Sequence, residues 1–357
     1  MSGIFGIASA QELKIKDGFS HFIAIKKFSD FKKSTSDNPN EIIFTSPEIS
    51  TPIAWNELVV SWNADAQKET YLKVEARGIY ADHSTKFYTL GLWSPDTEKF
   101  PRESVQDQKD SDGNVDTDTL TLEKPGAKIQ LRMTLGSAEK IQKPTLKFLG
   151  LSFCDTKAKP SSSSPNKSAW GKVLPVIERS QNSYPEEQGW CSPTSLSMVL
   201  THWSKITRRK ELALDVPEVA RAVFDKNYGT GNWPFNTAFA GSFQGMRSYV
   251  TRFSSATELE DWIAAGIPVI ISAPWHLLSP DRGNTGAGHL VVCVGFTENG
   301  DFYINDPGTN PKTDRVRHIY KRENVLNAWS KSHNTVYLVY PESAKIPKDQ
   351  FHHWERK

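Results

Sequence analysis

The sequence predicts a two-domain protein in which an all-β domain precedes a domain of mixed α and β structure. Before residue 155 the chain contains β-like segments and no convincing helix, whereas after residue 170 helical patterns come first and strands follow. Residues 156–169 are polar, rich in serine, lysine and proline, and free of large apolar side chains, as in a flexible linker. We therefore expect domains at residues 1–155 and 170–345.

The composition is ordinary for a folded protein of this size. The 357 residues are 38% hydrophobic and 24% charged, and the formal net charge is +2. So small a net charge gives no attraction to nucleic acid, and no run of apolar residues is long enough to span a membrane. We expect neither a nucleic-acid partner nor a membrane span.

The N-terminal half contains eight segments rich in β-branched and aromatic residues, separated by turn-forming residues. They are residues 21–28, 41–45, 58–62, 71–80, 86–93, 120–122, 128–135 and 145–153. Eight short strands of this kind are typical of a β-sandwich, here of jelly-roll type. We expect this domain to be an accessory unit that binds or orients a glycan or protein target.

The C-terminal half changes pattern and indicates an α+β domain. Apolar residues recur with helical spacing at about residues 192–205, 216–227, 237–249, 256–265 and 321–330. Strand patterns lie at about residues 267–273, 288–296, 301–306 and 336–340.

The stretch from Gln188 to Ser195 places Cys191 at the start of the first of these helices. The free amides and dipole at a helix N-terminus favour an anion, so a thiol at this position ionises readily. Cys191 is therefore a candidate nucleophile, and the alternative is a buried apolar thiol. The other two cysteines, Cys154 and Cys293, lie in apolar segments and are expected to be buried thiols.

A candidate base and a candidate carboxylate follow downstream. His289 begins a buried strand after small residues, and Asp306 ends the returning strand. A two-residue turn at Asn299-Gly300 would pair residue 289 with residue 310 rather than with Asp306. We therefore expect a longer turn or a β-bulge between the two strands.

The order Cys191, His289, Asp306 resembles that of papain-like cysteine peptidases. The chain is most similar to the stand-alone relatives of the bacteriocin-leader (double-glycine) peptidases, over roughly residues 172–341. The matching elements are Leu174-Pro-Val-Ile-Glu-Arg-Ser-Gln181, Cys191, Gly288-His289 with Val294-Gly295, and Asn305-Asp306-Pro307. The resemblance implies a papain-like fold and a peptide or protein substrate, and it implies no metal and no cofactor.

The resemblance also implies a mechanism by acyl transfer. The Cys191 thiolate would attack an amide carbonyl, His289 would protonate the leaving amine, and Asp306 would orient the imidazole. The oxyanion donor is open, because the position six residues before the cysteine, where papain-like enzymes carry glutamine, is Pro185. Gln181 is the favoured candidate if residues 182–189 carry an insertion, and Gln188 is the alternative.

Two other functions are compatible with the sequence. A thiol acyltransferase or amidase, such as a transglutaminase, deamidase or cell-wall amidase, would use the same three residues and differ in the acceptor or the amide. A non-catalytic binder of peptides or glycans would keep the site without the reaction. We expect the peptidase.

Several further segments have both a functional and an ordinary interpretation. Residues Asp110 to Asp118 carry alternating acidic groups that could bind calcium, although a solvated acidic loop is the commoner case. Gly229 to Phe235 could border the cleft and select substrate side chains, or Trp233 could pack in the core. His352 and His353 are expected in a polar tail. Residues Ile7 to Ala10 resemble the end of a signal peptide without its basic and apolar regions, which favours an extracellular or cell-envelope location over the cytoplasm.

Overall fold

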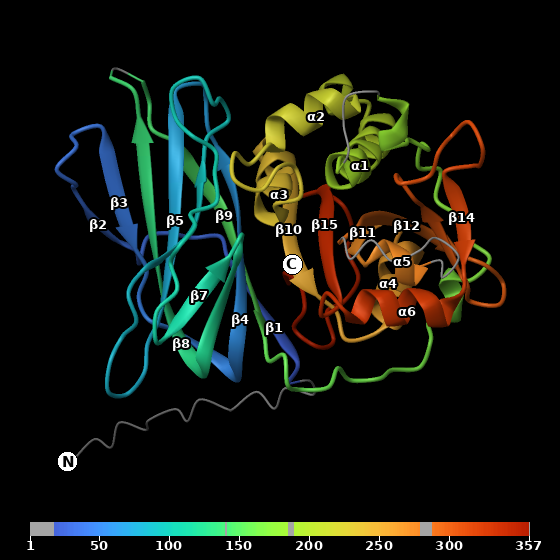
Figure 1. The fold of residues 1–357 in the computed structure, drawn as a ribbon, viewed down its shortest axis with the longest axis horizontal. Coiled ribbons are helices and arrows are strands. Elements are labelled where there is room, and N and C mark those ends of the chain that lie inside the picture. Colours follow the sequence, from blue (N-terminus) through green and yellow to red (C-terminus); the bar gives the residue numbers. More distant parts are fainter. Residues whose placement is uncertain (1–17, 140, 185–188, 279–287, 357) are drawn as a thin grey trace, which may run out of the picture.

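The computed structural model describes residues 18–139, 141–184, 189–278 and 288–356. It contains two domains, built mostly from β-strands with few helices (Figure 1). The signal-like residues Ile7 to Ala10 and the alternative oxyanion donor Gln188 lie outside the described residues.

The N-terminal domain is a set of nine antiparallel strands. They are β1 (Ser20–Ile25), β2 (Lys32–Ser34), β3 (Glu41–Thr45), β4 (Ile49–Asp65), β5 (Thr70–Gly78), β6 (Tyr88–Trp93), β7 (Gly113–Asp116), β8 (Thr119–Ser137) and β9 (Thr145–Cys154). The main path runs β1-β9-β4-β8-β3-β2, while β5 and β7 also pair with β8, and β6 pairs with β5. Side chains of β4, β5, β6, β8 and β9 fill one apolar core.

Two strands of this domain are much longer than the sequence predicts. The expected strands 120–122 and 128–135 are parts of a single strand, β8, and the expected strand 58–62 is the middle of β4. Pro125 and Gly126 interrupt the sequence pattern without ending β8, because the register of β4 against β8 shifts there. A residue in such an irregularity needs no ladder hydrogen bond, so proline is tolerated.

The C-terminal domain carries a six-stranded antiparallel sheet with helices on both sides (Figure 1). Its strands are β10 (Met246–Arg252), β11 (Val269–Ser272), β12 (Leu290–Phe296), β13 (Phe302–Asn305), β14 (Arg317–Tyr320) and β15 (Thr335–Pro341), in the order β10-β15-β11-β12-β13-β14. Its helices are α1 (Cys191–Thr207), α2 (Val216–Val223), α3 (Trp233–Ser242), α4 (Ala256–Ala264), α5 (Trp275–Leu278) and α6 (Arg322–Ser330).

The predicted helix at 237–249 is wrong. The helix there, α3, begins earlier and ends at Ser242, and strand β10 follows from Met246. Gly245 has φ +67°, a conformation that favours glycine, and it separates the helix from the strand. The spacing of the apolar residues in β10 fits a helix as well as a strand. Pairing with β15 stabilises the strand.

The expected irregularity between the strands that carry His289 and Asp306 is confirmed. Val292 pairs with Asn305, whereas Gly295 pairs with Tyr303, so the register shifts by one residue between Cys293 and Gly295. The connection after Phe296 is also longer than two residues, since Phe296 pairs with Phe302. Both features bring Asp306 back toward residue 289.

The two domains are joined along the edge of the C-terminal sheet. Strand β10 is an edge strand, and side chains of β4 bind its free backbone groups. Asn63 donates to the Ser248 carbonyl at 2.7 Å and accepts from the Ser248 amide at 3.2 Å, and Ser61 Oγ accepts from the Val250 amide at 2.9 Å. Helix α3 adds Phe235 to the N-terminal core. This contact pairs an edge that would otherwise be open.

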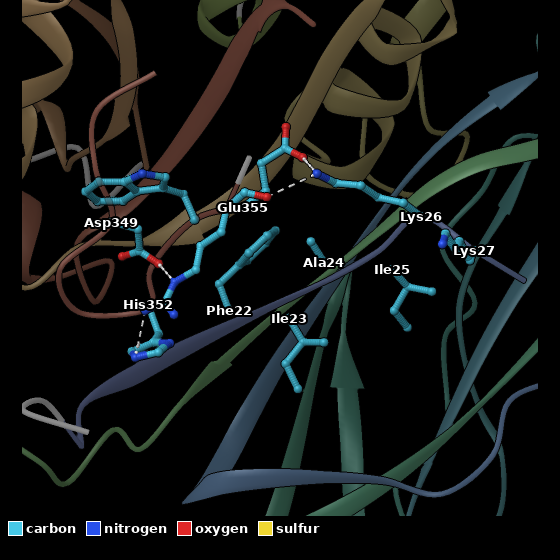
Figure 2. A pocket seen from close by; sticks show the side chains of 11 residues that line it. Phe22, Ile23, Ala24, Ile25, Lys26, Lys27, Asp349, His352 and Glu355 are labelled. Atoms are coloured by element: carbon cyan, nitrogen blue, oxygen red, sulfur yellow. Dashed lines mark hydrogen bonds and ion pairs between the residues drawn. The ribbon is translucent and has the colours of Figure 1, made fainter. Parts of the chain in front are cut away.

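The C-terminal segment is not a polar tail. His353 is fully buried and Trp354 is 2% exposed. The segment runs beside β1, where the Phe22 amide donates to the His352 carbonyl and Lys26 forms a 2.6 Å ion pair with Glu355. Figure 2 shows the side chains of Phe22, Lys26, His352 and Glu355 at a cavity between β1 and the segment, and the volume of this cavity is about 560 Å³.

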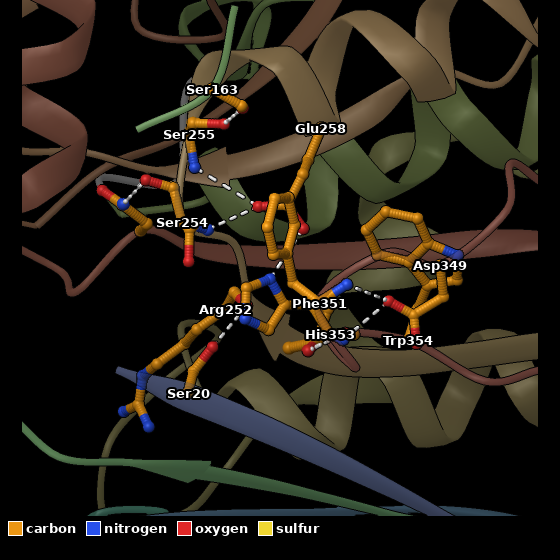
Figure 3. Close-up of polar contacts among 12 residues, drawn as sticks. Ser20, Ser163, Arg252, Ser254, Ser255, Glu258, Asp349, Phe351, His353 and Trp354 are labelled. Atoms are coloured by element: carbon orange, nitrogen blue, oxygen red, sulfur yellow. Dashed lines mark hydrogen bonds and ion pairs between the residues drawn. The ribbon is translucent and has the colours of Figure 1, made fainter. Parts of the chain in front are cut away.

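The same segment is also fixed to α4. His353 Nδ1 lies 2.6 Å from Glu258 Oε1, and the other oxygen of Glu258 accepts from the Ser254 and Ser255 amides at the start of the helix (Figure 3). The His353 amide donates to Asp349. Residues beyond 345 therefore belong to the packed structure, which the sequence did not indicate because charged residues surround these aromatic ones.

Residues 156–169 lie against the same helix. The Asn166 amide donates to Glu260 Oε2 at 2.6 Å, and its side chain donates to Asp261 at 2.6 Å. Ser163 Oγ lies 2.8 Å from Ser255 Oγ. The connection between the domains thus makes specific contacts along its path.

We expect the replacement Asn63→Ala to lower the free energy of unfolding by about 2–4 kcal/mol, because two buried backbone groups of Ser248 lose their partner. The matched control is Asn56→Ala in the same strand, whose side chain also makes two hydrogen bonds but is partly exposed. Urea unfolding followed by tryptophan fluorescence measures both. Equal effects of the two variants would contradict the role given to Asn63.

Candidate active site

Cys191 is the first residue of α1, and its side chain lies at a cavity. Trp190, the N-cap residue, makes no side-chain hydrogen bond to the helix start, so the first amides of α1 face the thiol region without a competing cap. Ser195 Oγ, one turn later, donates to the Leu290 carbonyl at 3.0 Å. This bond holds the start of the helix beside the residue that follows His289.

His289 directly precedes β12 and is 5% exposed. Its backbone carbonyl accepts from the Ala273 amide, which continues the pairing of β11 with β12. Its Nε2 lies 2.7 Å from Asp306 Oδ1, and the Cys191 thiol is also a hydrogen-bond partner of the ring. Because Asp306 occupies Nε2, Nδ1 is the ring nitrogen left for the sulfur.

Asp306 is fully buried and has a hydrogen-bond partner for each carboxylate oxygen. Oδ1 accepts from His289 and from the Gly308 amide at 2.8 Å, and Oδ2 accepts from the Tyr320 hydroxyl at 2.6 Å. A Cβ on Gly308 would lie 3.2 Å from Asp306 Oδ1, from His289 Cε1 and from Trp275 Nε1, so this close packing favours glycine. A buried carboxylate held in this way has one orientation.

Two further residues belong to the site: Tyr320, which the sequence did not indicate, and Trp275, which follows the predicted strand at 267–273 and was a candidate for a place near the cleft. Tyr320 ends β14, a strand that was not predicted, and the Trp275 ring lies edge-on to His289 with centroids 6.3 Å apart. Neither residue belongs to a recognisable motif. The distance of Tyr320 from Asp306 in sequence leaves no local signal.

The electrostatics of the three groups favour an ion pair of thiolate and imidazolium. Burial alone would raise the pKa of the Cys191 thiol, but the hydrogen bond and charge of His289 and the Leu290 and Ser192 amides bring it below its ordinary value. Burial would lower the pKa of His289, but the charge and hydrogen bond of Asp306, with the thiol, raise it to about 10. Each charge stabilises the other.

The two other cysteines are also free thiols, and Cys293 differs from Cys191 in the direction of its pKa shift. Cys154 and Cys293 are both buried, and the described residues form no disulfide. Burial raises the pKa of Cys293 to about 12, so its thiolate does not form near neutral pH. The expectation that both are buried thiols is confirmed.

Gln181 lies beside the loop that follows Asp306. Its backbone amide donates to the Pro307 carbonyl, and the neighbouring Ser180 hydroxyl bonds the carbonyls of Pro307 and Thr309. The side-chain Oε1 of Gln181 is buried and has no hydrogen-bond partner among the described residues. Gln181 is not among the residues that line the cavity at Cys191.

Asn305 has a structural position next to Asp306. Its side-chain amide donates to the Ile177 carbonyl at 3.1 Å, and its oxygen accepts from Arg317 Nε at 2.8 Å. These bonds fasten the segment from Leu174 to Gln181 against β13 and β14. The Asn-Asp-Pro sequence thus combines a packing residue with the carboxylate.

The cavity at Cys191 has a volume of about 790 Å³. Its lining includes Cys191, His289, Trp190, the loop between α2 and α3, and Thr97 of the N-terminal domain. Gly229, Thr230, Gly231 and Trp233 are among these residues, so the glycine-rich loop borders the cleft, which was one of its two predicted positions.

Two groups of residues carry side chains that could bind a cation. In the stretch Asp110 to Asp118 the carboxylates face different partners: Asp110 pairs with Lys86 at 3.0 Å, Asp112 with His83, and Asp118 accepts from the Trp233 amide. Elsewhere among the described residues, ligand atoms of Glu57, Cys154 and His333 lie within 4.8 Å of one another. Arg252 forms a 2.8 Å ion pair with Glu57 there, so a cation already neutralises the carboxylate.

We expect iodoacetamide to alkylate Cys191 faster at pH 6 than either other cysteine, and Asp306→Asn to slow this reaction at least tenfold. Without the carboxylate, burial lowers the pKa of His289, the imidazolium is lost, and the pKa of Cys191 rises. The difference in alkylation rate between the Asp306→Asn variant and the original protein should shrink at pH 9.5, where more of the Cys191 thiol ionises without the imidazolium of His289. Intact-protein mass spectrometry gives the rates, Asp314→Asn at an exposed site is the control, and an unchanged rate would contradict the ion pair.

None of the helices in the described part of the chain is long and apolar enough to cross a lipid bilayer.

A solved structure from Bacillus anthracis, described as a C39-like peptidase, is 20% identical with a TM-score of 0.38, and the match covers 49% of this chain and 99% of that one. A Vibrio parahaemolyticus protein is 10% identical with a TM-score of 0.17, over 92% of this chain and 89% of that one. No curated protein matches the chain.

Two family matches cover most of the sequence. Residues 19–153 match the family described as Peptidase C39 N-terminal domain, and residues 173–337 match the Peptidase_C39 like family. These families support a cysteine-peptidase-like function with a peptide or protein substrate. The chain therefore belongs to the C39-like cysteine peptidases, the group of the bacteriocin-leader peptidases, and carries the N-terminal domain of that group.

Proposed function

We propose that the protein hydrolyses peptide bonds with Cys191 as nucleophile, His289 as acid and base, and Asp306 as the residue that orients His289. The observation that carries the proposal is the buried 2.7 Å contact of His289 Nε2 with Asp306, beside a thiol whose pKa is below its ordinary value. Family membership supports the peptidase class.

In the first half of the reaction the Cys191 sulfur attacks the carbonyl carbon of the scissile amide. The C=O electrons move to oxygen and give a tetrahedral intermediate, which collapses as the C–N bond breaks. His289 transfers its Nδ1 proton to the departing amine. The acyl group then remains on Cys191 as a thioester, and His289 is neutral.

In the second half a water molecule attacks the thioester carbonyl. His289 removes a proton from this water, the C–S bond breaks, and the carboxylic acid product leaves. The released thiolate and the protonated imidazole restore the starting ion pair. Asp306 keeps the ring in one orientation throughout, because its two oxygens are held by Gly308 and Tyr320.

We propose Gln181 and the backbone amide of Cys191 as donors to the oxygen that gains negative charge. Support for Gln181 is its position next to Pro307 and its buried side-chain oxygen, which leaves the amide nitrogen as the end available for donation.

We also propose the domain architecture: a jelly-roll-like β-sandwich at residues 1–155, a connection at residues 156–169 and a papain-like domain at residues 170–345. Support for the sandwich is that β4 and β8 each exchange partners along their length around one core. Support for the papain-like arrangement is the cysteine helix packed on the sheet that carries His289 and Asp306.

We expect Cys191→Ala to abolish peptide cleavage, a loss of at least a thousandfold in kcat, because no other group of the site can form the thioester. An internally quenched peptide library and product mass spectrometry measure it, and Cys293→Ala is the matched control at a buried thiol. Cleavage by the Cys191→Ala protein would exclude the mechanism. Products with an intact backbone and a converted side-chain amide would identify a deamidase instead.

We expect Gln181→Ala to lower kcat by about tenfold to a thousandfold with little change in KM, because an oxyanion donor acts mainly on the transition state. The iodoacetamide rate of Cys191 should stay within about twofold of the original, since the ion pair is intact. Asn182→Ala, at the next residue, is the control. A change in KM alone would show that Gln181 binds substrate rather than the oxyanion.

A further inference from the structure

One wall of the cleft is the loop of residues 224–232, between α2 and α3. Tyr228, Gly229, Thr230 and Gly231 of this loop line the cavity, together with Phe224 at its start. Phe224 is 48% exposed and Tyr228 is 57% exposed. Large aromatic side chains that remain exposed in a cavity beside a reactive thiol can bind an apolar group of a ligand.

The N-terminal domain binds the beginning of this loop through Arg102. Arg102 is 3% exposed, and its Nη1 donates to the Arg221 carbonyl at 2.9 Å and reaches the Phe224 carbonyl at 3.5 Å. These carbonyls are at the C-terminal end of α2, where a cation also complements the helix dipole. Burial lowers the pKa of Arg102 only to about 10, so the guanidinium stays charged at neutral pH.

The N-terminal domain binds the end of the same loop through Asp118. Asp118 is buried, and its Oδ2 accepts from the Trp233 amide at 2.7 Å, at the first residue of α3. The helix start is therefore capped by a carboxylate of the other domain in addition to its own N-cap residue, Asn232.

The middle of the loop is tied to the segment after Arg102. The buried Asp225 accepts from the Ser104 amide at 3.0 Å, and the Asn227 side chain donates to the Ser104 carbonyl at 2.8 Å. Beside these bonds, the exposed Thr97 reaches the cavity itself. The N-terminal domain thus holds the cleft wall at its start, middle and end, and supplies one residue of the lining.

The loop is also connected to the nucleophile. Thr230 Oγ1 donates to the Gly189 carbonyl at 2.9 Å, two residues before Cys191. A displacement of the loop would therefore change the space beside the thiol. The thiol's own partners, His289 and the Leu290 and Ser192 amides, do not belong to the loop.

We propose that the N-terminal domain is a working part of the peptide-binding cleft: Arg102 and Asp118 position loop 224–232, and Thr97, Phe224 and Tyr228 together receive an apolar side chain of the substrate. The proposal rests on the proposed function, since the ligand is the peptide that Cys191 attacks. Arg102 and Asp118 are positioning residues, and Thr97 is a specificity-determining residue.

Peptidyl acyloxymethyl ketones, in which the thiolate displaces the carboxylate and forms a thioether, separate peptide recognition from thiol reactivity. We would use Xaa-Ala ketones with phenylalanine, leucine, lysine or aspartate as Xaa, and iodoacetamide as the small reagent. Intact-protein mass spectrometry gives both rates for Cys191. The original protein should react with the phenylalanine reagent at least tenfold faster than with the aspartate reagent.

Arg102→Met should lower the rate with the phenylalanine reagent at least tenfold and leave the iodoacetamide rate within about twofold. Arg102→Lys should recover part of the loss, because one cationic donor still reaches the helix carbonyls. The matched control is Arg132→Met, which breaks an ion pair with Glu75 elsewhere in the same domain. With a peptide that the enzyme cleaves, the same loss should appear in KM rather than kcat.

Thr97→Trp, at an exposed position, should change the order of preference among the four ketones and slow the phenylalanine reagent at least fivefold. The proposal is overturned if the Thr97→Trp variant reacts with the four ketones like the original protein. It is also overturned if a folded Arg102→Met protein reacts with the phenylalanine ketone at the original rate, or if its rates with that ketone and with iodoacetamide fall together. Failure of the proposed function is a separate result: the original protein would cleave no peptide while the ketones still discriminate.

Discussion

The buried contact between His289 and Asp306 is the interaction on which the proposed chemistry of this protein depends. A carboxylate without solvent is costly, and here three donors from three segments, His289, Gly308 and Tyr320, stabilise it. The fixed carboxylate raises the pKa of His289, and the imidazolium in turn lowers that of Cys191. The site therefore depends on strand β13, on its bulged pairing with β12, and on β14. These elements also belong to the packed sheet.

A second constraint is the edge of the six-stranded sheet. Strand β10 exposes backbone groups that need partners, and Asn63 and Ser61 of the N-terminal domain supply them. The C-terminal segment covers the adjoining surface with Trp354 and Glu355. Because these contacts are buried and polar, they fix the position of the two domains relative to each other. The N-terminal domain can hold one wall of the cleft only if its position is fixed in this way.

The structure agrees best with the sequence predictions where a local pattern carries the information. Helix α1, the buried strand after His289 and the bulge before Asp306 followed from periodicity and from the number of residues between motifs. The errors have physical causes. Residues 246–250 fit a helix or a strand until pairing with β15 decides, and β2, β7 and β14 are too short to show a period. The burial of His353 depends on Glu258, ninety-five residues away.

The sequence by itself determined the types and order of the candidate reactive groups: a cysteine at a helix start, a histidine before a buried strand and an aspartate after the returning one. It also determined that two regions of different pattern are joined by a polar connection. Only the tertiary structure decided what surrounds these groups, namely Tyr320 on Asp306, Trp275 beside His289, and Arg102 and Asp118 at the cleft loop. The reason is that periodicity and helix caps act over a few residues, whereas a pKa and a cleft wall depend on atoms that meet only when the chain has folded.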